Sequence, residues 1–97
     1  MKSFRWDPQK NILLKQDRGI GFEQVAVAVE AGNLLQIAPH QNSSKYPRQK
    51  IMIVAIDTYV YLVPFIEERD HYFLKTIIPS RKATRDFIEQ GDFDDQA

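Results

Sequence analysis

The first third of the chain repeats apolar residues at the spacing of an α-helix. The dipeptide Asp7-Pro8 marks the start of one helix, because Asp is a favourable N-cap and Pro fits the first helical position. We expect this helix to run to about Gln16, with Ile12 and Leu13 on its inner face. It ends at Gly19, since glycine readily adopts the left-handed conformation of a helix C-terminus.

A second helix is predicted between residues 22 and 31, and Gly32 stops it. Residues 4–6, ahead of the first helix, have the pattern of a short strand or an extended arm. Within that segment, Trp6 is expected to pack the first helix onto the sheet. The inner face of the second helix is expected to carry the apolar residues that recur at helical spacing, Phe22, Val25, Ala26 and Val29.

Most of the chain beyond the second helix has the pattern of β-strands. Ser80 then follows Pro79 and is placed to cap a C-terminal helix from Arg81 to about Gln90. This order predicts an α+β fold with its helices on one face of the sheet: two N-terminal helices packed on an antiparallel β-meander of about four strands, followed by a C-terminal helix. The predicted strands are Leu34–Ala38, Ile51–Ile56, Tyr59–Ile66 and Tyr72–Ile78.

Composition limits the chain to one small domain. Its 97 residues are enough for one modest core, and we assign residues 1–90 to the domain and 91–97 to an acidic tail. Hydrophobic residues make up 43% of the chain and charged residues 27%, which excludes a disordered protein. The N-terminus lacks the apolar stretch of a signal peptide, and the longest apolar run, Tyr59–Ile66, is too short to cross a membrane. We therefore expect a cytoplasmic protein without a membrane partner.

The net charge of zero hides an uneven distribution. Residues 1–50 carry eight Lys and Arg and four Asp and Glu, a balance of +4, whereas residues 51–97 carry five and nine, a balance of −4. Every charge after Arg85 is acidic, so residues 1–85 alone sum to +5. A basic body with an acidic tail favours an anionic ligand such as nucleic acid, although the tail is equally interpreted as a solvated segment that aids solubility.

The first candidate site is the cationic segment where the last strand gives way to the C-terminal helix. Free backbone N–H groups at such a junction attract anions, and a guanidinium binds a phosphate with two hydrogen bonds. The alternative is a solvated helix face that carries ordinary surface charges. The segment contributes Lys75, Arg81, Lys82 and Arg85.

The second candidate site is the long polar loop between residues 39 and 49. It collects an imidazole, a phenol and two cations, a mixture that suits RNA because it offers proton transfer, base stacking and phosphate binding. The alternative is a polar surface loop with Tyr46-Pro47 as a lid. The residues are His40, Lys45, Tyr46 and Arg48. With two histidines and no cysteine, we expect no metal site and no cofactor.

Two motifs at opposite ends of the chain resemble those of the BrnT family of type II toxins. The first is residues 4–11 (FRWDPQKN), followed by Arg18-Gly-Ile-Gly-Phe-Glu23. The second is Ile77-Ile-Pro-Ser-Arg-Lys-Ala83, which is similar to the family's Ile-Ser-Ala-Arg-x-Ala segment after a β-meander. The chain departs from the pattern at Arg18, where the family commonly has His, and at Pro79-Ser80, where it has Ser-Ala.

This resemblance implies a RelE-like fold and a metal-independent mRNA endoribonuclease that inhibits translation and growth. It also implies a cognate antitoxin that binds DNA through a ribbon-helix-helix or helix-turn-helix domain. In such a toxin, Arg81 is expected to act on the phosphate, with Lys75, Lys82, Arg85 and Arg48 binding RNA. Lys45, Tyr46 and His40 are then the acid, base or stacking candidates. The alternative is a catalytically inactive module of the same fold that binds a protein partner or nucleic acid.

Overall fold

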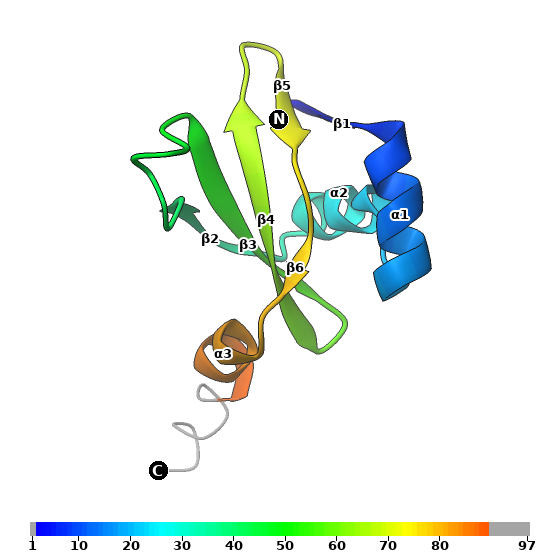
Figure 1. The fold of residues 1–97 in the computed structure, drawn as a ribbon. Helices are drawn as coiled ribbons and strands as arrows, with labels where there is room; N and C mark the ends of the chain where they lie inside the picture. The colour runs from blue at the N-terminus through cyan, green and yellow to red at the C-terminus, as the bar shows by residue number, and fades with distance from the viewer. Residues whose placement is uncertain (1, 90–97) are drawn as a thin grey trace.

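The fold is that of a computed structural model, which describes residues 2–89. The expected end of the C-terminal helix near Gln90 and the acidic tail of residues 91–97 lie outside this range. Figure 1 shows a mixed sheet with the two N-terminal helices on one side of it and the C-terminal helix beyond one end of its strands. In chain order the elements are β1 (Ser3–Trp6), α1 (Pro8–Arg18), α2 (Phe22–Glu30), β2 (Leu34–Pro39), β3 (Gln49–Ile56), β4 (Tyr59–Glu67), β5 (His71–Leu74), β6 (Ile78–Pro79), α3 (Arg81–Thr84) and a π-helical turn, η1 (Arg85–Glu89).

The α+β class is confirmed, but the sheet is larger than expected and is not wholly antiparallel. Its strand order is β1-β5-β4-β3-β2, and β6 pairs with β4. The four strands from β2 to β5 form antiparallel pairs, whereas β1 lies parallel to β5. Residues 4–6 therefore belong to an edge strand. Trp6 stacks on Phe22 of α2, with ring centroids 5.6 Å apart, and packs against the core that also holds Leu14 of α1.

The helix ends are those that the sequence predicted. The Asp7 side chain accepts a hydrogen bond from the Gln9 N–H, and Gly19 ends α1 with φ 69°. The predicted inner face of α1 is wrong, because Ile12 and Leu13 are each 53% exposed. The buried face carries Asn11 and Leu14, one helical turn apart.

Asn11 is buried because it joins α1 to α2. Its side-chain oxygen accepts a hydrogen bond from the Phe22 N–H (2.8 Å), and its amide group donates to Glu23 (2.9 Å). The Glu23 carboxylate also accepts from Lys15 (3.1 Å). One polar side chain thus satisfies a backbone donor at the start of α2 and fixes the angle between the two helices.

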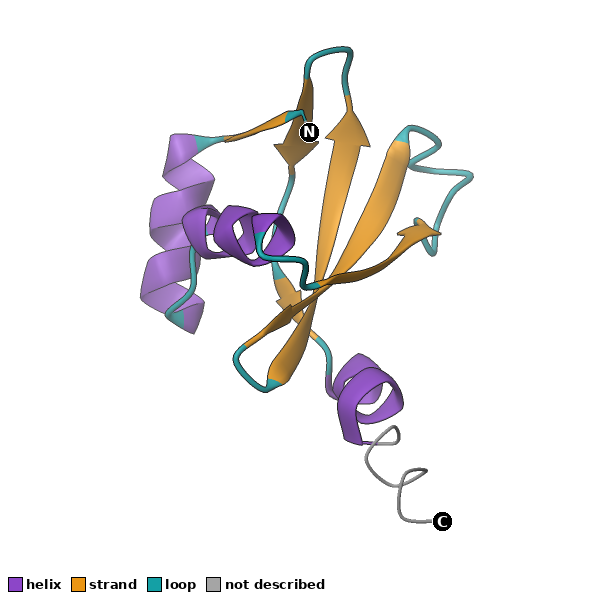
Figure 2. Ribbon diagram, turned by 180° about the vertical axis from the view of Figure 1, so that it is seen from behind, coloured by secondary structure: helices purple, strands orange, loops and turns teal. Residues whose placement is uncertain are grey.

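The sheet has apolar side chains on both faces. Met52, Val54, Val63 and Phe65 point to the face covered by α1 and α2, where they meet Leu14, Phe22 and Val25. Ile51, Ile53 and Val60 point to the other face, where they meet Ala83 of α3 and Ile88 of η1. The expectation that all helices share one face is therefore wrong. Figure 2 shows α2 in front of the sheet when the molecule is seen from behind, and α3 stands off at one end.

The predicted last strand, Tyr72–Ile78, is broken into β5 and β6. Between them the Lys75 N–H donates to the Pro64 carbonyl, and the fully buried Ile77 turns into the core beneath α1 and α2. Pro64 interrupts the strand pattern of residues 59–66, since proline inside a strand is typical of an edge or a bulge. It lies in the interior strand β4, opposite this break. The break lets the chain leave the sheet and reach its other face.

Replacing Asn11 with Ala is expected to lower the free energy of unfolding by about 1–3 kcal/mol, because it leaves the buried Phe22 N–H without a partner. Denaturant unfolding measures the change. The matched control is Gln16→Ala, an exposed position of the same helix that should change stability by less than about 0.5 kcal/mol. Equal effects of the two variants would contradict the role of Asn11.

Glu23 should make the helix pair sensitive to acid. Hydrogen bonds from Asn11 and from Lys15 lower its pKa below the usual 4.5. A lowered folded pKa means that the stabilisation is present above 4.5 and is lost as the pH falls through the folded value. Wild type should therefore exceed Glu23→Gln in stability near neutral pH, by less than about 1 kcal/mol because the side chain is half exposed, and the difference should vanish in acid. Unfolding of both proteins across this pH range provides the measurement, and a difference that does not change with pH would contradict the ion pair.

Candidate nucleic-acid interface

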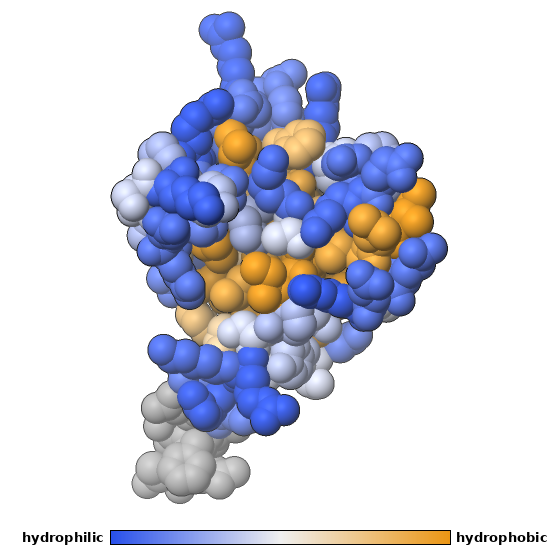
Figure 3. Space-filling model, viewed as in Figure 1, coloured by the Kyte–Doolittle hydropathy of each residue, from blue (hydrophilic) through white to orange (hydrophobic). Residues whose placement is uncertain are grey.

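The face of the sheet opposite α1 and α2, which we call the open face, is only partly covered. Between β2 and β6 it holds a cavity of about 290 Å³ with a largely apolar lining. Figure 3 views this face and shows an apolar centre bordered by hydrophilic residues. The lining residues are Ala38, Pro39, His40, Gln41, Ile51, Ile53, Leu62, Pro64 and Ile78.

The cationic segment reaches this cavity through one residue, Ile78 of β6. Lys75 follows β5, and its Nζ lies 5.4 Å from the ring centroid of Phe73. Arg81 begins α3, three residues after Ile78, which lines the cavity. Lys82 and Arg85 are exposed as well. The Arg85 Nε lies 3.9 Å from Asp86, so Arg85 is partly neutralised by its neighbour.

Backbone and hydroxyl groups anchor this segment to the end of β4. The Ser80 N–H donates to the Val60 carbonyl, and the Val60 N–H donates to the Thr84 hydroxyl (2.8 Å). The Ser80 side chain caps α3 by accepting from the Ala83 N–H, as the sequence predicted. Because Ala83 and Thr84 are buried against the sheet, the cationic side chains of the segment point to solvent.

On the opposite side of the cavity, the loop of residues 40–48 brings three of its four candidates together. The rings of His40 and Tyr46 lie 4.8 Å apart, and the Lys45 Nζ lies 5.3 Å from the Tyr46 ring centroid. Arg48 is not part of this group, since it forms an ion pair with Glu68 at 2.9 Å. The loop group therefore consists of His40, Lys45 and Tyr46. It contacts none of the α3 cations, and the two groups share only the open face that both border.

A backbone hydrogen bond determines the state of the His40 ring. The Asn42 N–H donates to its Nδ1 (3.0 Å). In the neutral ring Nδ1 is then the acceptor and Nε2 carries the hydrogen. His40 is thus prepared to donate a hydrogen bond from Nε2, and taking up a second proton at Nδ1 would break the bond to Asn42.

Two further arginines lie next to the candidate residues. Arg18, at the end of α1, donates to the carbonyl of Ile77 and so reaches the segment that leads to Arg81. Arg5 is in register with Phe73 in the parallel pair, which places it on the open face. The sequence did contain a signal for Arg18, because it stands where the family pattern commonly has His. Arg5 gave no signal, because the parallel pairing of β1 with β5 was not predicted.

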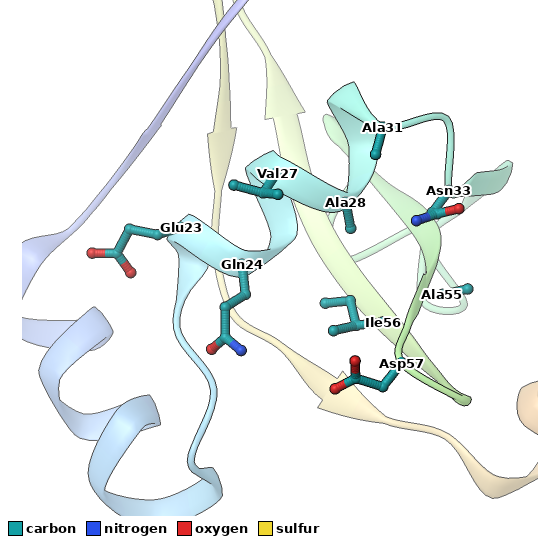
Figure 4. Close-up of a pocket in the computed structure, with 9 residues that line it drawn as sticks. All are labelled: Glu23, Gln24, Val27, Ala28, Ala31, Asn33, Ala55, Ile56 and Asp57. Atoms are coloured by element: carbon teal, nitrogen blue, oxygen red, sulfur yellow. The ribbon is translucent and has the colours of Figure 1, made fainter.

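A second groove lies on the helix side, between α2 and β3, and Figure 4 shows the side chains that line it. Val27, Ala28 and Ile56 supply its apolar surface. The charged groups in its lining are the carboxylates of Glu23 and Asp57. Because carboxylates repel phosphate, this groove suits nucleic acid less well than the open face.

Comparisons of the chain with protein families, curated proteins and solved structures found no match. Within residues 2–89, no three His, Asp or Glu side chains gather as metal ligands. In the same range, no helix is both long and apolar enough to span a membrane. The family resemblance of the two sequence motifs therefore remains a hypothesis, and the open face is the physical basis on which it can be tested.

Thr84→Val should lower the free energy of unfolding by about 1–3 kcal/mol, because it keeps the side-chain shape but leaves the buried Val60 N–H unpaired. Thr84→Ser is the control, since it keeps the hydroxyl and removes only a methyl group, at a cost of about 0.8 kcal/mol. Thermal and denaturant unfolding compare the two variants. A Val variant at least as stable as the Ser variant would contradict the anchor.

Proposed function

We propose that this chain is a metal-independent endoribonuclease, the toxin of a type II toxin–antitoxin pair with a RelE-like arrangement, and that RNA binds across its open face. The observation that supports this most is the composition of that face. Its apolar cavity is lined on one side by His40, whose ring contacts Tyr46 in the group with Lys45, and on the other by Ile78, which lies between Lys75 and Arg81 in the sequence. Single-stranded RNA needs both cations for its phosphates and apolar or aromatic surface for its unstacked bases.

The proposed reaction is an attack by a ribose 2′-hydroxyl on the adjacent phosphorus. A base takes the 2′-hydroxyl proton, the bond from phosphorus to the 5′-oxygen breaks, and an acid protonates that oxygen, leaving a cyclic phosphate. Arg81 stabilises the charge that develops on the phosphate, supported by Lys75 and Arg85. His40 serves as the acid in its imidazolium form, in which Nδ1 has taken up a proton and released the Asn42 N–H, so that Nε2 gives its proton to the leaving oxygen and the neutral ring remains. Lys45 and Tyr46 remain the candidates for the base.

The proposed protein partner is a DNA-binding antitoxin that covers the open face. Covering it would block RNA in two ways, since an acidic segment would neutralise Lys75 and Arg81 and apolar side chains would fill the cavity between them. A partner of this kind shares its binding surface with the substrate. Antitoxin and RNA should therefore compete for the protein.

A second candidate function is binding without catalysis, and one observation favours it. No carboxylate lines the cavity on the open face in the described part of the chain. Three carboxylates have a pKa below their usual value. In each, a side-chain hydrogen bond to the carboxylate stabilises the anionic form. They are Glu23, Glu67 and Asp70. Such a module would hold RNA or a partner on the same face without turnover.

Expression of the wild-type chain without a partner should arrest growth, and the purified protein should cleave single-stranded RNA in the presence of EDTA. Arg81→Ala should lower the cleavage rate by about 100-fold or more, the effect of removing a group that stabilises transition-state charge. Arg69→Ala is the matched control. It removes the same charge from the exposed turn between β4 and β5 and should leave cleavage unchanged.

The outcomes separate the two functions. Cleavage that Arg81→Ala abolishes and Arg69→Ala preserves supports the ribonuclease. RNA binding without cleavage by wild type would replace it with the binding module. If wild type neither binds nor cleaves RNA and its expression is harmless, both are wrong.

A further inference from the structure

We propose that the cavity on the open face is a nucleobase pocket, which holds one unstacked base of a single-stranded RNA. This inference rests on the proposed function and adds how the substrate is gripped. The cavity lies between two groups of candidate residues that do not touch one another. A base seated in it would connect them, with the phosphate of that nucleotide toward Arg81 and the base edge toward His40.

The walls of the cavity have the surface that a flat heterocycle requires. Ile51 and Ile53 of β3 and Leu62 of β4 form an aliphatic floor, and Ile78 of β6 forms a wall. Ile78 is 40% exposed although it is large and apolar, so its side chain is available to a ligand. The volume of about 290 Å³ is at the lower end of the roughly 300–1,000 Å³ found for ligand pockets, which favours a small ring over a peptide helix.

The residues with polar side chains in the lining are neighbours at one end of the cavity. They are His40 and Gln41, which follow β2. The His40 Nε2 hydrogen is a fixed donor, and the Gln41 amide offers both a donor and an acceptor. Every nucleobase carries acceptors and most carry donors along one edge, so this end can bind a base edge by hydrogen bonds.

The charges at the other end favour a nucleotide over a neutral apolar ligand. The Lys75 N–H donates to the carbonyl of Pro64, which lines the cavity, so the Lys75 backbone lies beside a lining residue, and its Nζ lies 5.4 Å from the Phe73 ring centroid. Arg81 follows three residues after Ile78. In a bound nucleotide, the cations would bind the phosphate and the apolar walls would contact the face of the base. The donors at the far end would bind the edge of the base.

Methyl NMR on the wild-type protein tests the pocket without any substitution. Nucleoside 5′-monophosphates should shift the δ1 methyl signals of the cavity isoleucines, Ile51, Ile53 and Ile78. The signals of Ile12 and Ile37, which lie outside the cavity, should not move. Ribose 5-phosphate, which has the phosphate but no base, should leave all five signals in place. Shifts caused equally by ribose 5-phosphate, or confined to Ile12 and Ile37, would overturn the proposal.

Two neighbouring residues of β2 provide a matched pair of variants. Ala38 lines the cavity, whereas Ile37 lies on the opposite face of the same strand and is 46% exposed. Ala38→Phe should fill the pocket and weaken the binding of a 2′-O-methyl RNA, which cannot be cleaved, by about tenfold, the contribution of one stacked base. Ile37→Phe should change this affinity less than twofold. An abasic oligonucleotide of the same length should bind wild type and both variants alike.

Different results would contradict the nucleobase pocket and the proposed ribonuclease function. If Ala38→Phe and Ile37→Phe bind RNA equally while wild type cleaves it, the pocket is wrong and the ribonuclease stands. If Ala38→Phe blocks binding of a protein partner but not of RNA, the cavity is a partner site and the proposal is overturned. If wild type binds no RNA, both inferences fail together.

Discussion

The pairing of β3 with β4 is the constraint on which the rest of the structure depends. It is the longest ladder of the sheet, running from Gln49 opposite Ile66 to Ile56 opposite Tyr59. Residues 51–54 of β3 are all buried, so this strand needs a cover on both faces. The helix pair α1 and α2 covers the larger core, on one face. The other receives only the short α3 and the turn η1.

This unequal cover explains why an apolar surface remains open at the centre of the molecule. The chain crosses to the second face through the break between β5 and β6, and Ser80 and Thr84 fasten it to Val60 at one end of β4. The covered part ends there. Beyond it the sheet keeps its apolar side chains but gains charged and aromatic neighbours from the loop of residues 40–48 and from the strand ends. A surface of this composition is unfavourable in water unless a ligand covers it.

Local signals in the sequence predicted the elements well, since they depend on single residues. Asp7 and Ser80 begin α1 and α3 because their side chains accept hydrogen bonds from the first helical N–H groups. Gly19 ends α1 because glycine adopts the left-handed conformation. The errors arose where tertiary contacts decide. A polar residue, Asn11, takes the buried place on α1 because α2 needs a hydrogen-bond acceptor there, and this turns Ile12 and Leu13 outward.

The candidate site was predicted as two separate segments, and no local pattern relates one segment to the other. Both segments reach the same cavity because the chain breaks after β5 and α3 crosses to the second face. Neither feature has a local signature, because Tyr72–Ile78 has the pattern of one continuous strand. For the same reason Arg5 was missed, since its place on the open face depends on a parallel pairing with Phe73, which lies 68 residues later in the chain.

The central claim is that the open face is the functional surface. Backbone hydrogen–deuterium exchange of the wild-type protein, with and without an uncleavable single-stranded RNA, tests it most directly. The account predicts slower exchange in residues 40–48 and 75–85 when RNA is bound, with α1 and α2 unchanged. Slower exchange confined to α2 and the turn at Asp57, the borders of the acidic groove, would contradict it.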